Sequence, residues 1–446
     1  MPSRRSFLMS STASLAMGSL LAQPAAAQTE DDRIDSLEPA AEDGSKQAGS
    51  NPVLRVALVG CGARGRGAAA QALRADPDTQ LVAMADAFPE PIESGTKIFA
   101  AIPDIADRVD VPAERKFVGI DCCEQLLANV EVDVVLLCSP PFFRPSQYAM
   151  VVEAGKHVFA EKPVATDVVG LKSVMETSRK AAEKNLQVVS GLCWRYETGM
   201  QETVKQIADG TIGRPIAASS VRYSGLVGRS VPRDASQTEF EHQLRNWYFY
   251  TWLSGDFIVE QFVHDLDMVA WAMGEYPTSV VATGGRETRP QEQGNIYDHF
   301  AAVFTFPSGA TYNATTRHQN GAEGIYYNRV LGTDGSADLM KYKMVSPEGK
   351  RLYHRREPRT VMHQLEHDEM YKAIREGRRI DNSDYMIQST LMGIMARESA
   401  YTGKMLTPEK LLASDLSLQP NDISWDAEPP AADVAVPGIT TLQRGA

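Results

Sequence analysis

The chain has 446 residues, of which 43% are hydrophobic and 23% are charged, and its formal net charge at pH 7 is -12. This length allows two domains that each have a core, and the composition is that of an ordinary globular protein. The acidic balance argues against a protein that binds nucleic acid or an anionic membrane surface.

The first residues predict an export signal. Arg4 and Arg5 precede a mildly hydrophobic run of small residues that ends in three alanines at residues 25–27. This pattern is typical of a twin-arginine signal peptide at residues 1–27, with an uncut signal anchor or an ordinary secretory signal as alternatives. We therefore expect a periplasmic or otherwise exported protein, a disordered linker at residues 28–52, and no stable membrane span after the signal is removed.

A strand followed by glycines opens the predicted first domain. Val53 to Val59 is an apolar run that suits a strand buried on both faces of a parallel sheet, and a Gly-Cys-Gly-Ala-Arg-Gly segment follows at once. This is the dinucleotide-binding fingerprint in its required context. Gly60 permits the tight turn, Gly62 lets the backbone approach a pyrophosphate, and Gly65 lets the next helix pack on the strand.

The residues after the fingerprint extend the predicted nucleotide site. A helix is expected from about Arg64 to Arg74, and the N–H groups at its start, around Ala63 and Arg64, can bind phosphate. A second strand ends at Asp86, 21 residues past Gly65, where the fold places a carboxylate that accepts a ribose hydroxyl. Asp86 favours NAD over NADP, although Arg64 or Arg66 would soften that preference.

Strands and helices go on alternating up to residue 193, which predicts a doubly wound parallel sheet, a Rossmann domain, over residues 53–193. The expected helices lie near Pro89 to Ala101, Cys122 to Asn129, Pro145 to Ala154 and up to Lys184, and the strands at Val132 to Cys138, His157 to Ala160 and Leu186 to Cys193. Two strand ends, followed by Ser139-Pro140 and by Glu161-Lys162, lie at the edge where the nicotinamide half of a dinucleotide is expected.

Longer strands joined by hairpin turns predict a second, α+β domain with a mostly antiparallel sheet at residues 194–414. One hairpin joins Asn295 to Phe306 with Ala310 to Arg317, and another turns at Thr333-Asp334-Gly335. Two helices, Val361 to Glu376 and Ser383 to Thr402, close the predicted fold, and a tail rich in Pro and Asp occupies residues 415–446.

A segment between the predicted domains carries candidate catalytic groups. Asp256 to Met273 predicts a helix in which Glu260, His264, Asp267 and Trp271 share one face. An acid one turn before a histidine can hold one tautomer and raise the pKa of the imidazole, as a general base requires. The alternative is an ordinary helix whose polar groups are satisfied in a semi-polar interface.

Lys162 is the second candidate, because it lies at the carboxyl edge of the sheet, where its ammonium can hydrogen-bond a substrate hydroxyl. The alternative is a solvated loop charge. Aromatic and basic residues at Arg195, Trp247 and Tyr248 suit the binding of a sugar ring, although aromatic clusters more often serve packing.

The five cysteines have no zinc-ligand spacing and lie beside predicted core elements, so we interpret them as small core residues rather than disulfides. We expect no metal site, because His264 and Asp267 have no clear third ligand.

The fingerprint, Glu161-Lys162-Pro163 and the His264 segment together resemble the glucose-fructose oxidoreductase, inositol dehydrogenase and rhizopine-catabolism (Gfo/Idh/MocA) family over residues 53–402. The resemblance implies NAD(P), sugar or polyol substrates, and an open-faced sheet that makes homodimer or homotetramer contacts. Lys162 and His264 match the family's catalytic lysine and histidine. Glu260 departs from the family's usual Asp, and the segment around it resembles an exported subgroup.

These observations predict an exported NAD(P)-dependent oxidoreductase that acts on a sugar, polyol or glycoside hydroxyl. His264 removes the hydroxyl proton, Lys162 hydrogen-bonds the oxygen, Glu260 orients His264, and Asp267 contacts the substrate. Export favours a tightly bound cofactor that is recycled in place. The alternatives are an NAD-dependent glycoside hydrolase or lyase on the same scaffold, and an inactive sugar-binding protein.

Overall fold

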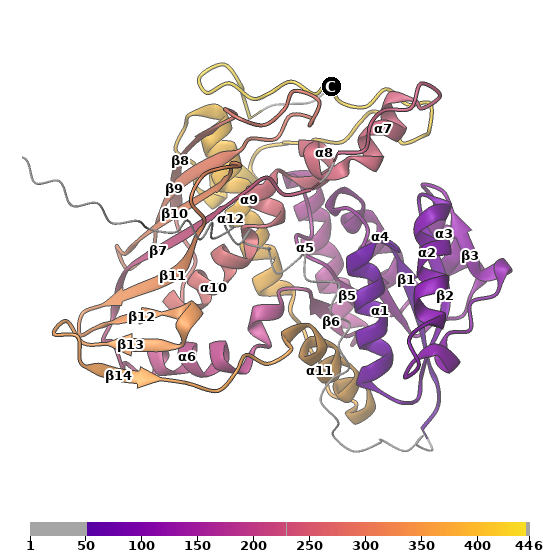
Figure 1. Cartoon of the computed structure of the whole chain (residues 1–446), viewed down its shortest axis with the longest axis horizontal. Coiled ribbons are helices and arrows are strands. Elements are labelled where there is room, and N and C mark those ends of the chain that lie inside the picture. The colour runs from indigo at the N-terminus through magenta and orange to yellow at the C-terminus, as the bar shows by residue number, and fades with distance from the viewer. Residues whose placement is uncertain (1–50, 229, 443–446) are drawn as a thin grey trace, which may run out of the picture.

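The structure is a computed structural model that describes residues 51–228 and 230–442 (Figure 1). The predicted signal peptide and the linker up to residue 50 lie outside the described residues. Within the described part, no helix combines the length and the apolar character needed to cross a membrane.

The first sheet is parallel throughout, with the strand order β3-β2-β1-β4-β5-β6. Its strands are β1 (Leu54–Val59), β2 (Thr79–Asp86), β3 (Lys116–Val118), β4 (Val134–Leu137), β5 (His157–Ala160) and β6 (Val188–Ser190). Strand order reverses between β1 and β4, so the carboxyl ends of these two strands flank a natural binding crevice. The doubly wound parallel sheet is therefore confirmed.

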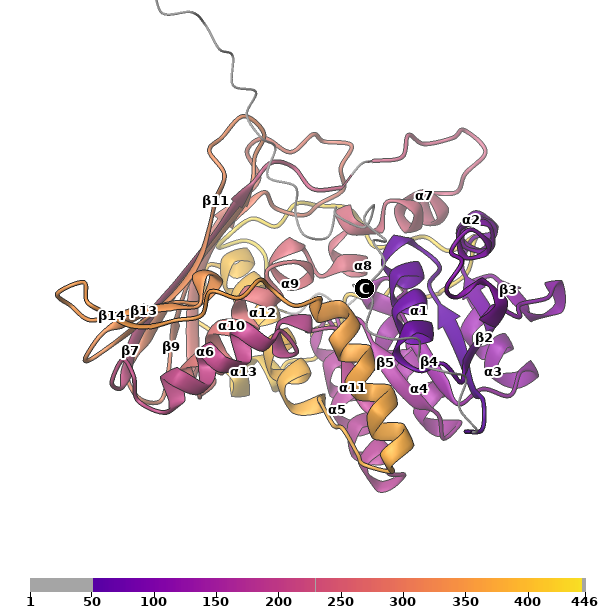
Figure 2. The same ribbon diagram turned by 60° about the horizontal axis from the view of Figure 1, so that its bottom comes forward.

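Helices cover both faces of this sheet, as alternating side chains of β1 require. The helices within the Rossmann domain are α1 (Ala63–Ala75), α2 (Pro89–Ala100), α3 (Cys122–Asn129), α4 (Arg144–Glu153) and α5 (Val168–Glu183). Val56 and Leu58 pack with α1, whereas Ala57 and Val59 pack toward α3, α4 and α5. The helix α11 (Met362–Glu376), from much later in the chain, runs beside α1 and completes its face (Figure 2).

Two details of this domain differ from the prediction. The edge strand β3 was not expected, because three residues carry no periodic pattern. The last strand is shorter than Leu186 to Cys193, because the Arg195 N–H donates to the Leu192 carbonyl at 3.0 Å and turns the chain out of the sheet.

The second sheet has eight strands in the order β14-β13-β12-β11-β7-β10-β9-β8. Its strands are β7 (Pro215–Ser224), β8 (Ser279–Gly285), β9 (His299–Thr305), β10 (Thr311–His318), β11 (Ile325–Gly332), β12 (Ser336–Asp338), β13 (Lys343–Val345) and β14 (Arg351–His354). β7 and β10 run parallel, and every other described strand pair of this second sheet is antiparallel. The two predicted hairpins, β9–β10 and β11–β12, are confirmed.

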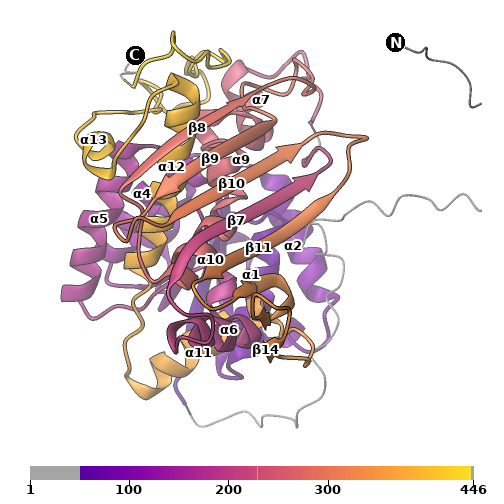
Figure 3. The ribbon, with the colours of Figure 1, turned by 90° about the vertical axis from the view of Figure 1, so that its left-hand side faces the viewer.

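One face of the second sheet is covered and the other is open. The remaining helices are α6 (Thr198–Ala208), α7 (Glu239–Arg245), α8 (Thr251–Ser254), α9 (Phe257–Glu260), α10 (Val263–Met273), α12 (Ser383–Thr402) and α13 (Pro408–Leu412). α10 and α12 pack against the inner face, and Figure 3 shows the strands lying in front of them. Val281 and Val303 are exposed on the outer face.

The predicted helix from Asp256 to Met273 is interrupted, which corrects the sequence-based interpretation. α9 ends at Glu260 and α10 begins at Val263. In a continuous helix the Glu260 carbonyl would accept the His264 N–H, but here it accepts the Lys162 ammonium at 2.8 Å. Glu260 and His264 therefore belong to different helices, so the predicted shared face is wrong for Glu260, whereas His264, Asp267 and Trp271 do lie on one helix.

Asp256 anchors the start of α9 from a buried position with a positive φ of 69°. Its carboxylate accepts hydrogen bonds from the N–H groups of Phe257 at 2.6 Å and Tyr297 at 2.9 Å, and from the Tyr401 hydroxyl. Burial raises the pKa of Asp256 to about 6, against the effect of these hydrogen bonds.

After α13 the described chain forms no further helix or strand and crosses the surface above α8 and α7 (Figure 1). Trp425 in this tail packs against Phe88 of the first domain, with ring centroids 5.5 Å apart. The tail therefore connects the second domain to the first domain.

Candidate active site

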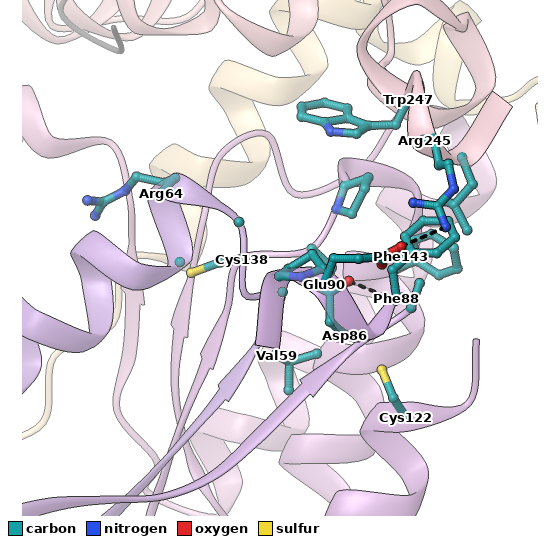
Figure 4. Close-up of a pocket in the computed structure, with 18 of the residues that line it drawn as sticks. Val59, Arg64, Asp86, Phe88, Glu90, Cys122, Cys138, Phe143, Arg245 and Trp247 are labelled. Carbon is teal, nitrogen blue, oxygen red and sulfur yellow. Dashed lines mark hydrogen bonds and ion pairs between the residues drawn. The ribbon is translucent and has the colours of Figure 1, made fainter. Parts of the chain in front are cut away.

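A cavity of about 710 Å³ lies at the carboxyl ends of β1, β2 and β4 (Figure 4). Most of the residues predicted to bind a cofactor line it: Gly60, Gly62, Ala63, Arg64, Gly65, Asp86, Ser139 and Pro140. The other two, Glu161 and Lys162, are absent from the lining. The predicted fingerprint, Asp86 at the end of β2 and the strand end followed by Ser139-Pro140 thus meet at one cavity.

The three glycines of the fingerprint have three different reasons to lack a side chain. Gly60 has a φ of +90°, and a Cβ there would lie 2.4 Å from the Cys138 carbonyl carbon. A Cβ on Gly65 would lie 1.9 Å from the Gly60 oxygen, so only glycine lets α1 approach β1. At Gly62 a Cβ would meet nothing within 4 Å, because this backbone faces open space. The loop therefore fits a pyrophosphate seated at the start of α1.

Asp86 presents a carboxylate at the end of β2. One carboxylate oxygen accepts the Cys61 N–H at 2.7 Å and the other accepts the Phe88 N–H at 3.0 Å. Burial raises the pKa of Asp86, and these backbone hydrogen bonds oppose the rise. Each oxygen has further acceptor capacity, so the position fits the hydroxyl groups of a cofactor ribose.

Arg64 does not stand beside Asp86, which corrects the expectation that it softens the preference for NAD. Its guanidinium forms ion pairs with Glu161 and with Glu366 of α11, the latter at 3.0 Å. Figure 4 shows the side chain pointing away from Asp86. Arg66 donates to the Cys61 carbonyl at 2.9 Å, so both arginines have protein partners.

Glu161 does not line the cavity and is buried in its ion pair with Arg64. Burial by itself would raise the pKa of Glu161, but the positive charges of Arg64 and Lys162 outweigh it and hold the pKa below its usual value. A carboxylate held this way stays ionised inside the protein. Glu161 thereby links the glycine loop to the segment that carries Lys162.

Lys162 meets the junction between α9 and α10. Its ammonium lies 3.1 Å from the Glu260 carboxylate and 2.8 Å from the Glu260 carbonyl, and only 8% of the residue is exposed. His264, also buried, is the second residue of α10. The contact brings an ammonium from the first domain to the segment that carries the imidazole.

This geometry gives Glu260 a partner that the sequence did not predict. Its carboxylate pairs with Lys162, and the break after Glu260 removes the one-turn spacing of a continuous helix, so the orientation of His264 by Glu260 stays a prediction. Glu260 is therefore positioned to hold the lysine.

Sequence comparison gives the same two-domain picture. Residues 54–190 match the oxidoreductase family described as GFO_IDH_MocA with an NAD-binding Rossmann fold, and residues 200–338 match the GFO/IDH/MocA C-terminal domain. The chain belongs to the Gfo/Idh/MocA oxidoreductase family. Its first domain is accordingly an NAD-binding Rossmann domain.

Individual relatives are distant. The chain is similar to inositol 2-dehydrogenase of Rhizobium meliloti, with 25% identity over 230 residues, which are 52% of this chain and 58% of that protein. It spans about half the length of the curated relatives it matches.

Two solved structures share the fold. Aldose-aldose oxidoreductase from Caulobacter crescentus, complexed with glycerol, has a TM-score of 0.62 at 18% identity. Scyllo-inositol dehydrogenase from Lactobacillus casei, with bound NAD(H) and scyllo-inositol, has a TM-score of 0.60 at 16% identity. Each comparison covers 80% of this chain and 99% of the other.

Two residues predicted to bind substrate in this Gfo/Idh/MocA protein bind each other. Arg195 donates two hydrogen bonds of 2.9 Å to Asp267, which also accepts the Ser389 hydroxyl at 2.7 Å. The guanidinium is stacked between the rings of Trp271 and Tyr385, at 4.8 and 4.3 Å. The pair links the turn after β6 to α10, the Ser389 hydrogen bond adds α12, and substrate binding by either residue stays a prediction.

The two predicted aromatic residues occupy different positions. Trp247 lines the cavity, whereas Tyr248 packs edge-on against Trp247 and Phe249, with centroids 5.7 Å apart in both pairs. Their contact with a substrate likewise stays a prediction.

Sequence reasoning missed Arg144, the first residue of α4. This buried arginine donates to the carbonyl groups of Ser139, at 2.7 Å, and Pro163. It thereby ties a strand end that lines the cavity to the residue that follows Lys162. A single arginine after a Ser-Pro-Pro segment has no spacing pattern that would have revealed this role.

The five cysteines are free thiols, four of them buried, which confirms their interpretation as core residues. Among the described residues, no group of three or more His, Cys, Asp or Glu side chains is arranged to hold a metal ion.

Proposed function

We propose that this protein is an exported NAD-dependent oxidoreductase that acts on a hydroxyl group of a polyol or sugar. The observation that carries the proposal is the meeting of Lys162 with the α9–α10 junction, next to the cavity that fits the dinucleotide. Relatives named inositol 2-dehydrogenase support a cyclic polyol or sugar as the substrate class.

Each group has a separate task in the proposed reaction. His264 accepts the proton of the substrate hydroxyl, and Lys162 donates a hydrogen bond to the same oxygen. Glu260 holds the lysine ammonium in place through its carboxylate and its carbonyl. The glycine loop and Asp86 would hold NAD, which would supply the hydride acceptor for the carbon that carries the hydroxyl.

The proposal includes export and a recycled cofactor. The paired arginines near the N-terminus support the twin-arginine route, which carries folded proteins. Because an exported enzyme is not expected to be supplied with fresh NAD(H), we infer that the nucleotide stays bound and that one substrate oxidises it after another has reduced it. The open outer face of the second sheet supports a homodimer or homotetramer.

The decisive experiment combines cofactor identification with turnover. Mass analysis of the nucleotide released from purified protein should identify NAD, and a panel of inositols and aldoses should change the absorbance of the bound nucleotide at the nicotinamide band. Lys162→Met and His264→Gln should each lower the rate by about 100-fold or more while keeping the nucleotide bound.

Exposed residues of the same kinds provide matched controls. Lys172→Met on α5 and His354→Gln on β14 should leave the rate unchanged. Wild-type turnover by the two site variants would refute the assignment. Release of an aglycone without net NADH formation would instead show a glycoside hydrolase or lyase.

A further inference from the structure

The cofactor cavity is not closed by the Rossmann domain alone. Val231, Leu244, Arg245 and Trp247, which follow β7 in the second part of the chain, also line it. Figure 4 shows Arg245 and Trp247 across the cavity from Val59 and Asp86. We call residues 231–247 the cover segment.

Arg245 attaches the cover segment to the first domain. Its guanidinium lies over the Phe88 ring, 3.9 Å from the ring centroid, and pairs with Glu90 at 3.2 Å. Glu241 on α7 holds the same guanidinium at 2.9 Å. Phe88 follows Asp86 by two residues, so this attachment lies at the end of the cavity that fits the adenosine half of NAD.

Asn246 fixes the cover segment internally. Its side-chain oxygen accepts the Val231 N–H at 2.7 Å, and its amide donates to the Val231 carbonyl at 3.1 Å. Val231 and α7 therefore form one connected piece.

The C-terminal tail holds the same piece from outside. The Trp425 ring packs on Phe88, and its carbonyl accepts the hydroxyl of Thr238, the residue that caps α7, at 2.8 Å. Phe88 is thus held by Arg245 and by Trp425. One residue of the first domain is fixed by two separate segments of the second part of the chain.

A cluster of aromatic rings packs the cover segment against the first domain. Trp252 packs edge-on against Phe142 at 4.8 Å, and its indole N–H donates to Gln243 of α7 at 2.7 Å. Phe240, also on α7, lies 5.7 Å from the same indole. Lifting the cover segment would expose these apolar rings to water, which is unfavourable.

We propose that the cover segment and Trp425 form a clasp that retains NAD as a non-dissociating group, with Arg245 as the residue that locks it over the adenosine end. This inference rests on the proposed function, because it explains how one nucleotide serves successive turnovers. Release of the nucleotide then requires both the Arg245 ion pairs and the Trp425 contact to open.

The test measures exchange of NADH from the holoenzyme. Protein loaded with NADH is mixed with a large excess of NAD, and the decay of nicotinamide fluorescence gives the dissociation rate. The wild type should keep its nucleotide through gel filtration. Trp425→Ala and Arg245→Met should each release NADH at least about 10-fold faster, whereas Trp425→Phe, which keeps a ring against Phe88, should stay close to the wild type.

Arg329→Met is the matched control, because Arg329 also stacks on a ring, that of Tyr327 at 4.4 Å, and pairs with Asp338, but lies on β11. Its release rate should equal that of the wild type. Should Trp425→Ala fail to fold, Thr238→Val keeps the Trp425 ring, removes the hydrogen bond to the Trp425 carbonyl together with the cap of α7, and should still speed release.

The outcomes separate the two proposals. Release by the wild type within seconds, or equal rates in all the variants, overturns the clasp, while polyol oxidation with added NAD would leave the oxidoreductase standing. A protein that binds no nucleotide at all overturns both.

Discussion

Replacing Gly62 with alanine is expected to weaken NAD binding without weakening the fold. The backbone φ of -62° at Gly62 is ordinary for alanine, and the new Cβ would meet no protein atom within 4 Å. The methyl group would instead occupy the space in which the loop approaches the pyrophosphate. Keeping the phosphate from one backbone N–H removes a charge-assisted hydrogen bond of about 1.5–3 kcal/mol, which is about 10- to 150-fold in Kd.

Alanine substitutions at two neighbouring glycines provide the comparison for Gly62→Ala. Gly65→Ala places a Cβ 1.9 Å from the Gly60 oxygen and should destabilise the protein with or without nucleotide, because backbone must shift. Gly67→Ala, whose Cβ would lie 3.4 Å from the flexible end of Arg64, should stabilise α1 by about 0.5–1 kcal/mol and leave NAD affinity unchanged.

Titration of NADH fluorescence measures the affinity, and urea unfolding without nucleotide measures the stability. If Gly62→Ala binds NADH as tightly as the wild type, the pyrophosphate does not approach this part of the loop. If it loses as much stability as Gly65→Ala, the open space at Gly62 is not a ligand site.

Three further predictions concern buried polar groups. Arg144→Met should lower kcat by about 10- to 100-fold with nucleotide still bound, because Ser139 and Pro163 lose their common donor; unchanged steady-state kinetics would contradict this. Folding raises the pKa of Asp256 from 3.8 to about 6, so the folded state holds the proton more tightly than the unfolded state does. The free energy of unfolding should therefore fall as the pH rises from 4 to 7. The loss is up to about 3 kcal/mol, at about 1.36 kcal/mol for each pKa unit. The stability of the wild type relative to Asp256→Asn should therefore fall over that range, as urea unfolding at pH 4.5 and 7.5 will show. Asp267→Asn should cost about 3–5 kcal/mol by leaving the Arg195 charge buried, and adding Arg195→Met should restore part of it; strictly additive losses would exclude a direct pair.

The parts of the fold that were predicted correctly depend on short-range patterns. The strand before Gly60, the turn and the strand ending in Asp86 occupy about thirty consecutive residues, so periodicity and glycine spacing identify them. His157–Ala160 and Ser383–Thr402 were predicted with the bounds that the structure has, because an apolar run and a long helical pattern delimit them.

The parts that were missed depend on contacts between distant residues. The helix is interrupted after Glu260 where its carbonyl meets Lys162, 98 residues earlier in the chain, and no helical pattern contains that information. Arg64 was expected to soften the preference for NAD that Asp86 gives, but it pairs with Glu366, 302 residues later in the chain. The cover segment likewise carries no signal that it reaches the nucleotide cavity.

Helix α11 has a consequence for the order in which the molecule is assembled. Its Met370 and Tyr371 fill apolar surface on the first sheet, and its Glu366 pairs with Arg64 at the glycine loop. During translation the first domain remains incomplete until this late helix has left the ribosome. A gene fragment that ends after the first sheet would encode a Rossmann domain without α11. Its apolar surface under Met370 and Tyr371 would be exposed to water, and Arg64 would lack its ion pair with Glu366.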